Sequence, residues 1–134
     1  MSENILIIED EAERFVATID KLKESYNVTI ARSIEAANNF FDLKKSVDLI
    51  VLDVMMSYRG YESEKTDYGM ETGWVYYNEK LKEMKEAKIL VWTNNLSIFN
   101  KPWGENVVAK IPKSTEIGHL SKIVGKILLK YNIK

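Results

Sequence analysis

Short runs of apolar, mostly β-branched residues recur five times along the chain and predict β-strands. The runs cover residues 5–8, 28–31, 49–52, 89–92 and 107–109. Because they are almost continuously apolar, rather than alternating with polar residues, they are typical of parallel strands covered on both faces. The pattern therefore predicts a parallel sheet in the middle of the molecule.

The segments between these runs repeat apolar residues at the three-and-four spacing of amphipathic helices. The stripes cover residues 12–22, 34–41, 74–84 and 117–131. Ser114 or Thr115 is the expected N-cap of the last helix, with Glu116 in its first turn. Residues 94–106 contain two adjacent asparagines and a Lys-Pro-Trp-Gly stretch, which predict a short or irregular fourth helix.

Five alternations of strand and helix predict an α/β fold with a doubly wound parallel sheet, formed by residues 1–134 as a single domain. Residues 57–72 stand apart because they are polar and have no clear periodicity. We expect a long inserted loop there, carrying Tyr58, Tyr61 and Tyr68. A partner-binding surface and a disordered insert are both compatible with this composition.

Composition and charge exclude several classes of function. The chain is 46% hydrophobic and 29% charged with a formal net charge of -1, so it is globular and has no basic excess for direct nucleic-acid binding. It has no cysteine and one histidine, which excludes thiolate chemistry and a multi-histidine metal site. No apolar run approaches the roughly 18 residues of a membrane span, and we expect a cytoplasmic protein.

Polar side chains stand at the ends of four predicted strands. Glu9 and Asp10 follow the first strand, Asp53 closes the third, Thr93 closes the fourth and Lys113 follows the fifth. In a parallel sheet these positions meet at one edge, where ligands bind. Clustered carboxylates repel one another and favour a hard cation such as Mg²⁺, and the adjacent lysine and hydroxyl suit a phosphoryl group.

These residues, in this order, resemble the receiver domain of bacterial two-component response regulators. The matching pieces are residues 5–11, 48–56 and 72–74, Thr93 and Lys113, and they extend over nearly the whole chain. The resemblance implies a flavodoxin-like (βα)5 fold with strand order 2-1-3-4-5. It also implies a phosphoacceptor signalling domain and not an enzyme, with at most self-phosphorylation and self-dephosphorylation activity.

By this resemblance Asp53 is the phosphoacceptor, and a histidine kinase or phosphotransfer protein is the donor. Asp10 and Asp53 would bind Mg²⁺ directly, Glu9 would bind it through water, and the backbone carbonyl of Met55 would complete the protein ligands. Phosphorylation would shift a two-state equilibrium that a separate output protein reads. The sequence leaves open whether the chain also forms a homodimer.

The resemblance also assigns the two phosphate contacts. Thr93 would bind a phosphoryl oxygen, and Lys113 would pair with the acyl phosphate. Lys110 is a rival for the pairing role. We favour Lys113 because seven positions separate it from Leu120 of the last helix, as in the family pattern.

The chain departs from the family pattern at several positions. Ser57 and Ser114 stand where proline is usual, and Lys110 stands where an aromatic switch residue is typical. Asp53 and Gly73 are 20 positions apart, roughly a dozen more than in typical receivers, which accounts for the inserted loop. The departures lie on the side that would signal to a partner, whereas the phosphorylation chemistry is retained.

Two other functions are weighed against the phosphoacceptor. A phosphorylation-independent interaction module would explain Lys110, the weak fourth helix and the tyrosine-containing loop. An aspartate-based phosphatase would need a second aspartate two residues after Asp53, where Met55 stands. Trp92 and Trp103 are expected to be packing residues and not a ligand platform.

Overall fold

A central parallel sheet organises the computed structural model, which describes residues 3–131. Its five strands lie in the order β2-β1-β3-β4-β5, and every neighbouring pair is parallel. The strands are β1 (Asn4–Ile8), β2 (Asn27–Ala31), β3 (Leu49–Leu52), β4 (Lys88–Trp92) and β5 (Val107–Ile111). This confirms the predicted fold class and strand order.

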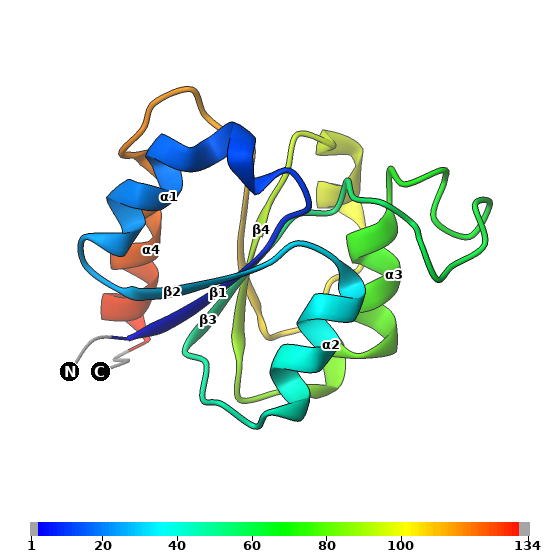
Figure 1. The fold of residues 1–134 in the computed structure, drawn as a ribbon, viewed down its shortest axis with the longest axis horizontal. Coiled ribbons are helices and arrows are strands. Elements are labelled where there is room, and N and C mark those ends of the chain that lie inside the picture. Colours follow the sequence, from blue (N-terminus) through cyan, green and yellow to red (C-terminus); the bar gives the residue numbers. More distant parts are fainter. Residues whose placement is uncertain (1–2, 132–134) are drawn as a thin grey trace.

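Helices cover both faces of the sheet (Figure 1). One face carries α1 (Val16–Lys23) and α4 (His119–Lys130), and the other carries α2 (Ile34–Asp42) and α3 (Thr72–Glu79). Successive strand residues point to opposite faces, so each strand contributes to two cores.

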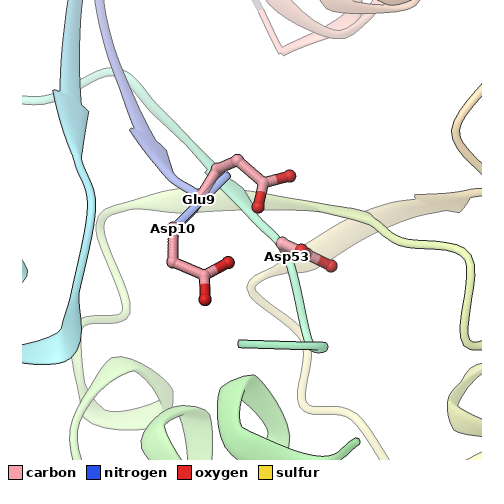
Figure 2. Close-up of side chains that lie close together, drawn as sticks. All are labelled: Glu9, Asp10 and Asp53. Atoms are coloured by element: carbon pink, nitrogen blue, oxygen red, sulfur yellow. The ribbon is translucent and has the colours of Figure 1, made fainter. Parts of the chain in front are cut away.

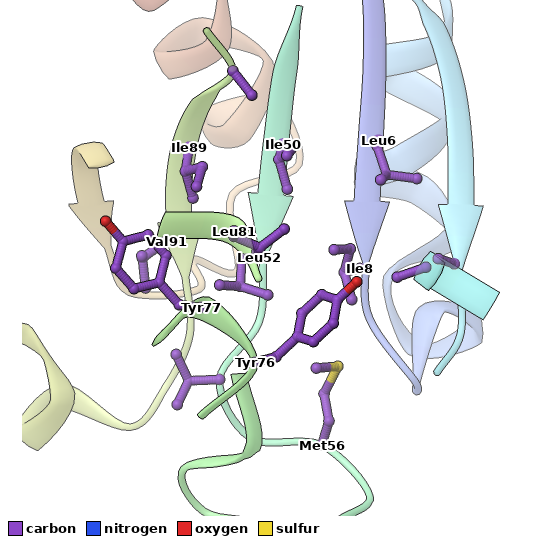
Figure 3. Packing of buried hydrophobic residues seen from close by; sticks show 14 of the residues in the cluster. Leu6, Ile8, Ile50, Leu52, Met56, Tyr76, Tyr77, Leu81, Ile89 and Val91 are labelled. Carbon is purple, nitrogen blue, oxygen red and sulfur yellow. The ribbon is translucent and has the colours of Figure 1, made fainter. Parts of the chain in front are cut away.

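Leu6 and Ile8 of β1 belong to the core under α2 and α3, where Tyr76 points toward Ile8 and Tyr77 lies beside Val91 of β4 (Figure 3). Ile5 of the same strand joins the core beneath α1 and α4. Burial on both faces explains why the strand runs are continuously apolar.

Two of the predicted helices have boundaries that differ from the sequence-based expectation. The first helix starts with a 3-10 turn, η1 (Ala12–Phe15). The third was expected to reach residue 84, but α3 ends at Glu79 and a separate 3-10 turn, η2 (Leu81–Glu83), follows because the backbone of Lys80 leaves the helical region (φ -136°, ψ -57°). Between β4 and β5 there is only η3 (Leu96–Asn100), which confirms the expected short and irregular helix.

The expected N-cap of the last helix is wrong. Gly118 precedes the first helical residue of α4, and no side chain caps this end. Ser114 instead accepts a hydrogen bond from the backbone N–H of Glu116 (3.0 Å), because its hydroxyl closes a local turn four residues upstream.

The inserted loop between β3 and α3 is anchored at its base. The Met56 N–H donates to the Gly69 carbonyl (3.0 Å), and the Thr72 hydroxyl donates to the Met56 carbonyl (2.8 Å). Thr72 is already the first residue of α3, so the loop ends one residue earlier than expected. The loop extends from the body beside α3 (green in Figure 1). Within residues 3–131, no helix combines the length and apolar character that a membrane span requires.

Candidate functional site

The ends of β1 and β3 bring three carboxylates together at the carboxyl edge of the sheet. Glu9 and Asp10 follow β1, and Asp53 follows β3, so adjacent strands place them side by side (Figure 2). One oxygen of each carboxylate lies within 4.8 Å of one oxygen of each of the others. Glu9 and Asp53 are 1% and 2% exposed, which makes their negative charges expensive to keep in the absence of a counter-charge.

Backbone N–H groups fix the orientation of the three carboxylates. The hydrogen bonds run from Glu11 to Glu9 (3.2 Å), from Met55 to Asp53 (3.2 Å) and from Ser57 to Asp10 (2.9 Å). The other oxygen of Asp10, Oδ1, is buried and has no hydrogen-bond partner among the described residues. A buried oxygen without a donor is rare in folded proteins and is suited to a cation.

Lys113 supplies the positive charge of the site. Its ammonium group donates to Glu9 Oε1 and to Asp53 Oδ2, the latter at 3.1 Å, and its side chain is 8% exposed. The backbone N–H of Lys113 donates to Asn94 Oδ1 (3.2 Å), which ties the segment after β5 to the segment after β4. Lys110 points elsewhere and donates to the Phe99 carbonyl (3.1 Å), so the structure brings Lys113, and not Lys110, to the carboxylates.

The charge of the cluster favours a divalent cation. Burial, as the largest cause, and the negative charge of Asp53 together raise the pKa of Glu9 to about 8, against the lowering effect of Lys113. If a bound cation keeps all three carboxylates ionised, they and the ammonium carry a formal charge of -2, which one divalent cation would balance. Closely spaced carboxylate oxygens, together with the unpaired Oδ1 of Asp10, fit a hard ion such as Mg²⁺.

Thr93 lies at the same edge but is not joined to the cluster. It follows β4, is fully buried and accepts a hydrogen bond from the Asn95 N–H (3.3 Å). Within residues 3–131, no hydrogen bond links its hydroxyl to a carboxylate. Met55 lies beside the cluster and donates its N–H to Asp53, while a role for its carbonyl as a metal ligand stays a prediction.

An aromatic pair beside Lys113 was not foreseen as part of the site. The Lys113 ammonium lies 4.2 Å from the ring centroid of Phe15 and 4.8 Å from that of Trp92. Trp92 packs in the core, as expected, but it also faces this charge. For Trp92, the sequence signal that could have indicated this role is its position directly before Thr93 at a strand end. No sequence signal indicated Phe15.

Comparisons with known proteins identify the fold. No protein-family model and no curated protein matches the chain. Among solved structures, it is similar to a response regulator from Thermotoga maritima, with 21% identity over 96% of this chain and 98% of that one and a TM-score of 0.69. The response regulator TrrA from the same organism, in complex with Mg²⁺ and BeF, gives 21% identity over 94% and 99% of the two chains and a TM-score of 0.64.

A structure of TrrA bound to the histidine kinase ThkA matches at 25% identity over 94% of this chain and 98% of that one, with a TM-score of 0.67. Each match spans nearly the whole of both chains. The chain therefore has the fold of a response regulator receiver domain, which confirms the resemblance that its sequence carries at the level of the fold.

Proposed function

We propose that residues 1–134 form a single receiver domain that accepts a phosphoryl group on Asp53 in the presence of Mg²⁺ and thereby changes its contacts with another protein. One observation carries the proposal: Glu9, Asp10 and Asp53 meet Lys113 at the carboxyl edge of a receiver fold. This fold places ligands at that edge.

The proposed reaction is a phosphoryl transfer from a phosphohistidine. A carboxylate oxygen of Asp53 forms the new P–O bond as the P–N bond of the donor breaks, and the donor imidazole leaves. Lys113 stands 3.1 Å from Asp53 Oδ2, where its ammonium can pair with a phosphoryl oxygen. The buried hydroxyl of Thr93 is the proposed second donor.

In this proposal Mg²⁺ is held by Asp10 and Asp53 directly, by Glu9 through water and by the carbonyl of Met55. When bound, the ion neutralises charge on the transferring phosphoryl group. It also gives the unpaired Oδ1 of Asp10 a partner. The crystallised complex of TrrA with Mg²⁺ and BeF supports the choice of metal.

The proposed donor is a histidine kinase or a phosphotransfer protein, and the complex of TrrA with ThkA supports the former. The output is a separate protein in the cytoplasm, and no activity beyond self-phosphorylation and self-dephosphorylation is proposed.

Intact mass after incubation with acetyl phosphate, with and without Mg²⁺, tests this function. We expect the wild type to gain one phosphoryl group only with Mg²⁺, and Asp53→Asn to gain none. Asp20→Asn, at an exposed position of α1, is the matched control and should behave like the wild type. Labelling of Asp53→Asn at the wild-type rate would refute the assignment.

A phosphorylation-independent interaction module is the second candidate. The observation that favours it is the segment after β4, where η3 replaces a full helix and Lys110 is bound to the Phe99 carbonyl. If the chain is such a module, calorimetry should detect Mg²⁺ binding while intact mass shows no phosphoryl gain. Binding to the partner should then be unchanged in Asp53→Asn.

A further inference from the structure

Two aromatic rings contact the ammonium group of Lys113 in addition to the carboxylates. Its nitrogen lies over the ring of Phe15, from the end of η1, and over the ring of Trp92, the last residue of β4. The two rings contact each other edge to face, with centroids 5.1 Å apart and planes at 66°. Two elements far apart in the sequence thus form one aromatic binding site for the lysine, which we call the seat: the rings of Phe15 and Trp92.

The seat is shielded from water, which strengthens the attraction between a cation and a ring face. The side chain of Lys113 is 8% exposed, and Trp92 is 2% exposed. An ammonium group has three N–H donors, and two of them reach Glu9 and Asp53. The rings therefore stabilise the charge without occupying any carboxylate oxygen.

Phe15 and Lys113 line the same open groove. Phe15 is half-buried, and the groove has a volume of about 350 Å³ and is also lined by Asn94 and Thr18. Loss of the ring would bring water from the groove to the ammonium group and weaken its attraction to the remaining ring. Trp92, in contrast, is part of the hydrophobic core beneath α1 and α4.

We propose that Phe15 and Trp92 are positioning residues that keep the Lys113 ammonium beside Asp53 when a metal ion and a phosphoryl group occupy the carboxylate oxygens. The inference rests on the proposed phosphoacceptor function. A bound metal ion would draw on the charge of Glu9, one of the two anionic partners of Lys113. The contacts with the rings do not depend on the carboxylates and would keep the lysine next to Asp53.

Two substitutions of Phe15 separate positioning from packing. Phe15→Leu keeps an apolar side chain and removes the ring face, whereas Phe15→Tyr keeps the face. We expect Phe15→Leu to slow phosphorylation by acetyl phosphate about fivefold and Phe15→Tyr to stay within about twofold of the wild type. A purely structural role would lower the thermal stability of Phe15→Leu but leave its phosphorylation rate, compared at equal folded fraction, and its Lys113 resonances like those of the wild type. Val16→Ala, at an exposed neighbouring position, is the control.

A second readout needs no phosphorylation. In NMR spectra of lysine-labelled protein, ring currents from Phe15 and Trp92 should shift the Lys113 Hε resonances away from those of exposed lysines. We expect this shift to persist when Mg²⁺ is added, to shrink in Phe15→Leu and to remain in Phe15→Tyr. Lys113→Gln identifies the resonance.

The two readouts distinguish failure of this inference from failure of the function. If acetyl phosphate labels the wild type, but Phe15→Leu matches it in rate and in the Lys113 shift, the inference is overturned and the function stands. If the wild type is not labelled at all, the function fails. The NMR measurement alone then decides whether the rings hold the ammonium, and loss of the shift on addition of Mg²⁺ overturns the seat as well.

Discussion

Two regions at the carboxyl edge of the sheet are built in different ways. The acidic site lies at the ends of β1 and the central strand β3. Backbone hydrogen bonds to the neighbouring strands hold it: the Asp53 N–H donates to the Ile8 carbonyl and the Glu9 N–H to the Ala31 carbonyl, each at 3.0 Å. The region between β4 and β5 has only the five-residue turn η3.

Aromatic packing covers the sheet where a longer helix is absent. Trp103 contacts Trp74 and Tyr77 edge to face, with centroid distances of 4.7 and 4.9 Å, and its indole N–H donates to the Ile98 carbonyl (2.9 Å). Burial of apolar surface has no strict geometric requirement, whereas a metal and phosphoryl site does. Sheet hydrogen bonds therefore fix the acidic site, whereas the cover beside β4 and β5 depends on side-chain packing.

Substitution of Gly73, in α3, should displace the backbone of Asp53 and have the largest effect of the changes considered. A Cβ at this position would lie 2.4 Å from the carbonyl oxygen of Asp53 and 2.7 Å from the Cα of Val54. Because both are backbone atoms, we expect Gly73→Ala to lower the free energy of unfolding by about 3 kcal/mol and to weaken Mg²⁺ binding. Urea unfolding and calorimetric titration measure the two effects.

Gly125→Ala is the matched control for this substitution. Gly125 lies inside α4, and the nearest atom to its added Cβ would be the hydroxyl of Tyr26 at 3.4 Å. Alanine should be neutral or stabilise the helix by up to about 1 kcal/mol. Equal loss of stability in both variants would mean that α3 does not depend on close approach to the backbone of Asp53.

Asn106 tests the region between β4 and β5 without touching the site. It is buried and donates to the carbonyls of Leu81 (2.9 Å) and Met84 (3.2 Å), and it accepts from the Tyr77 hydroxyl (2.7 Å). Asn106→Leu removes all three hydrogen bonds. The carbonyls of Leu81 and Met84 keep backbone donors, but the Tyr77 hydroxyl loses its acceptor, so we expect a loss of about 2 kcal/mol in urea unfolding. Tyr77→Phe, which removes one hydroxyl, should lose about half as much. A changed Mg²⁺ affinity in either variant would show that the two regions are coupled.

The sequence predicts most of this fold because the strands are buried on both faces, and burial on both faces requires continuous runs of apolar residues. The weak fourth helix could be predicted too, since Pro102 and paired asparagines interrupt it. Helix ends were harder to predict. Lys80 is an ordinary helix former, and only tertiary packing accounts for the break after α3.

The site was predictable as far as it depends on strand ends. Glu9 and Asp53 follow their strands directly, Lys113 comes two residues after the end of β5, and parallel strands bring their carboxyl ends together. The contact of Phe15 with Lys113 could not be predicted, because it depends on how the turn η1 rests on the end of β4. The anchoring of Asp10 by the Ser57 N–H is hidden for the same reason, since any residue except proline offers that donor.

Two lysines near β5 allow a direct comparison of the two regions, with a smaller expected effect. Lys113 faces Asp53, whereas Lys110 is bound to the Phe99 carbonyl. We expect Lys113→Gln to reduce the conformational response to phosphorylation about tenfold, which is about 1.4 kcal/mol, with less effect on phosphate acceptance. Lys110→Gln should leave the response within about twofold. Amide NMR spectra report the response and intact mass reports acceptance; the opposite ranking would mean that Lys110 is the pairing lysine.

Asn95 links the inserted loop to the end of β4, and its loss should have the smallest effect. Its side-chain amide donates to the Met70 carbonyl (2.9 Å), while its backbone N–H donates to the Thr93 hydroxyl (3.3 Å). Asn95→Ala removes the first bond and keeps the second, so we expect a loss of about 0.5 to 1 kcal/mol and faster hydrogen exchange in residues 57–71. Ser97→Ala, which removes only the hydroxyl that donates to Asn95 Oδ1 (2.6 Å), should leave that exchange unchanged. If the exchange of the loop were the same in all three proteins, its order would come from its own base at Met56 and Gly69, and the loop would be independent of the segment that carries Thr93.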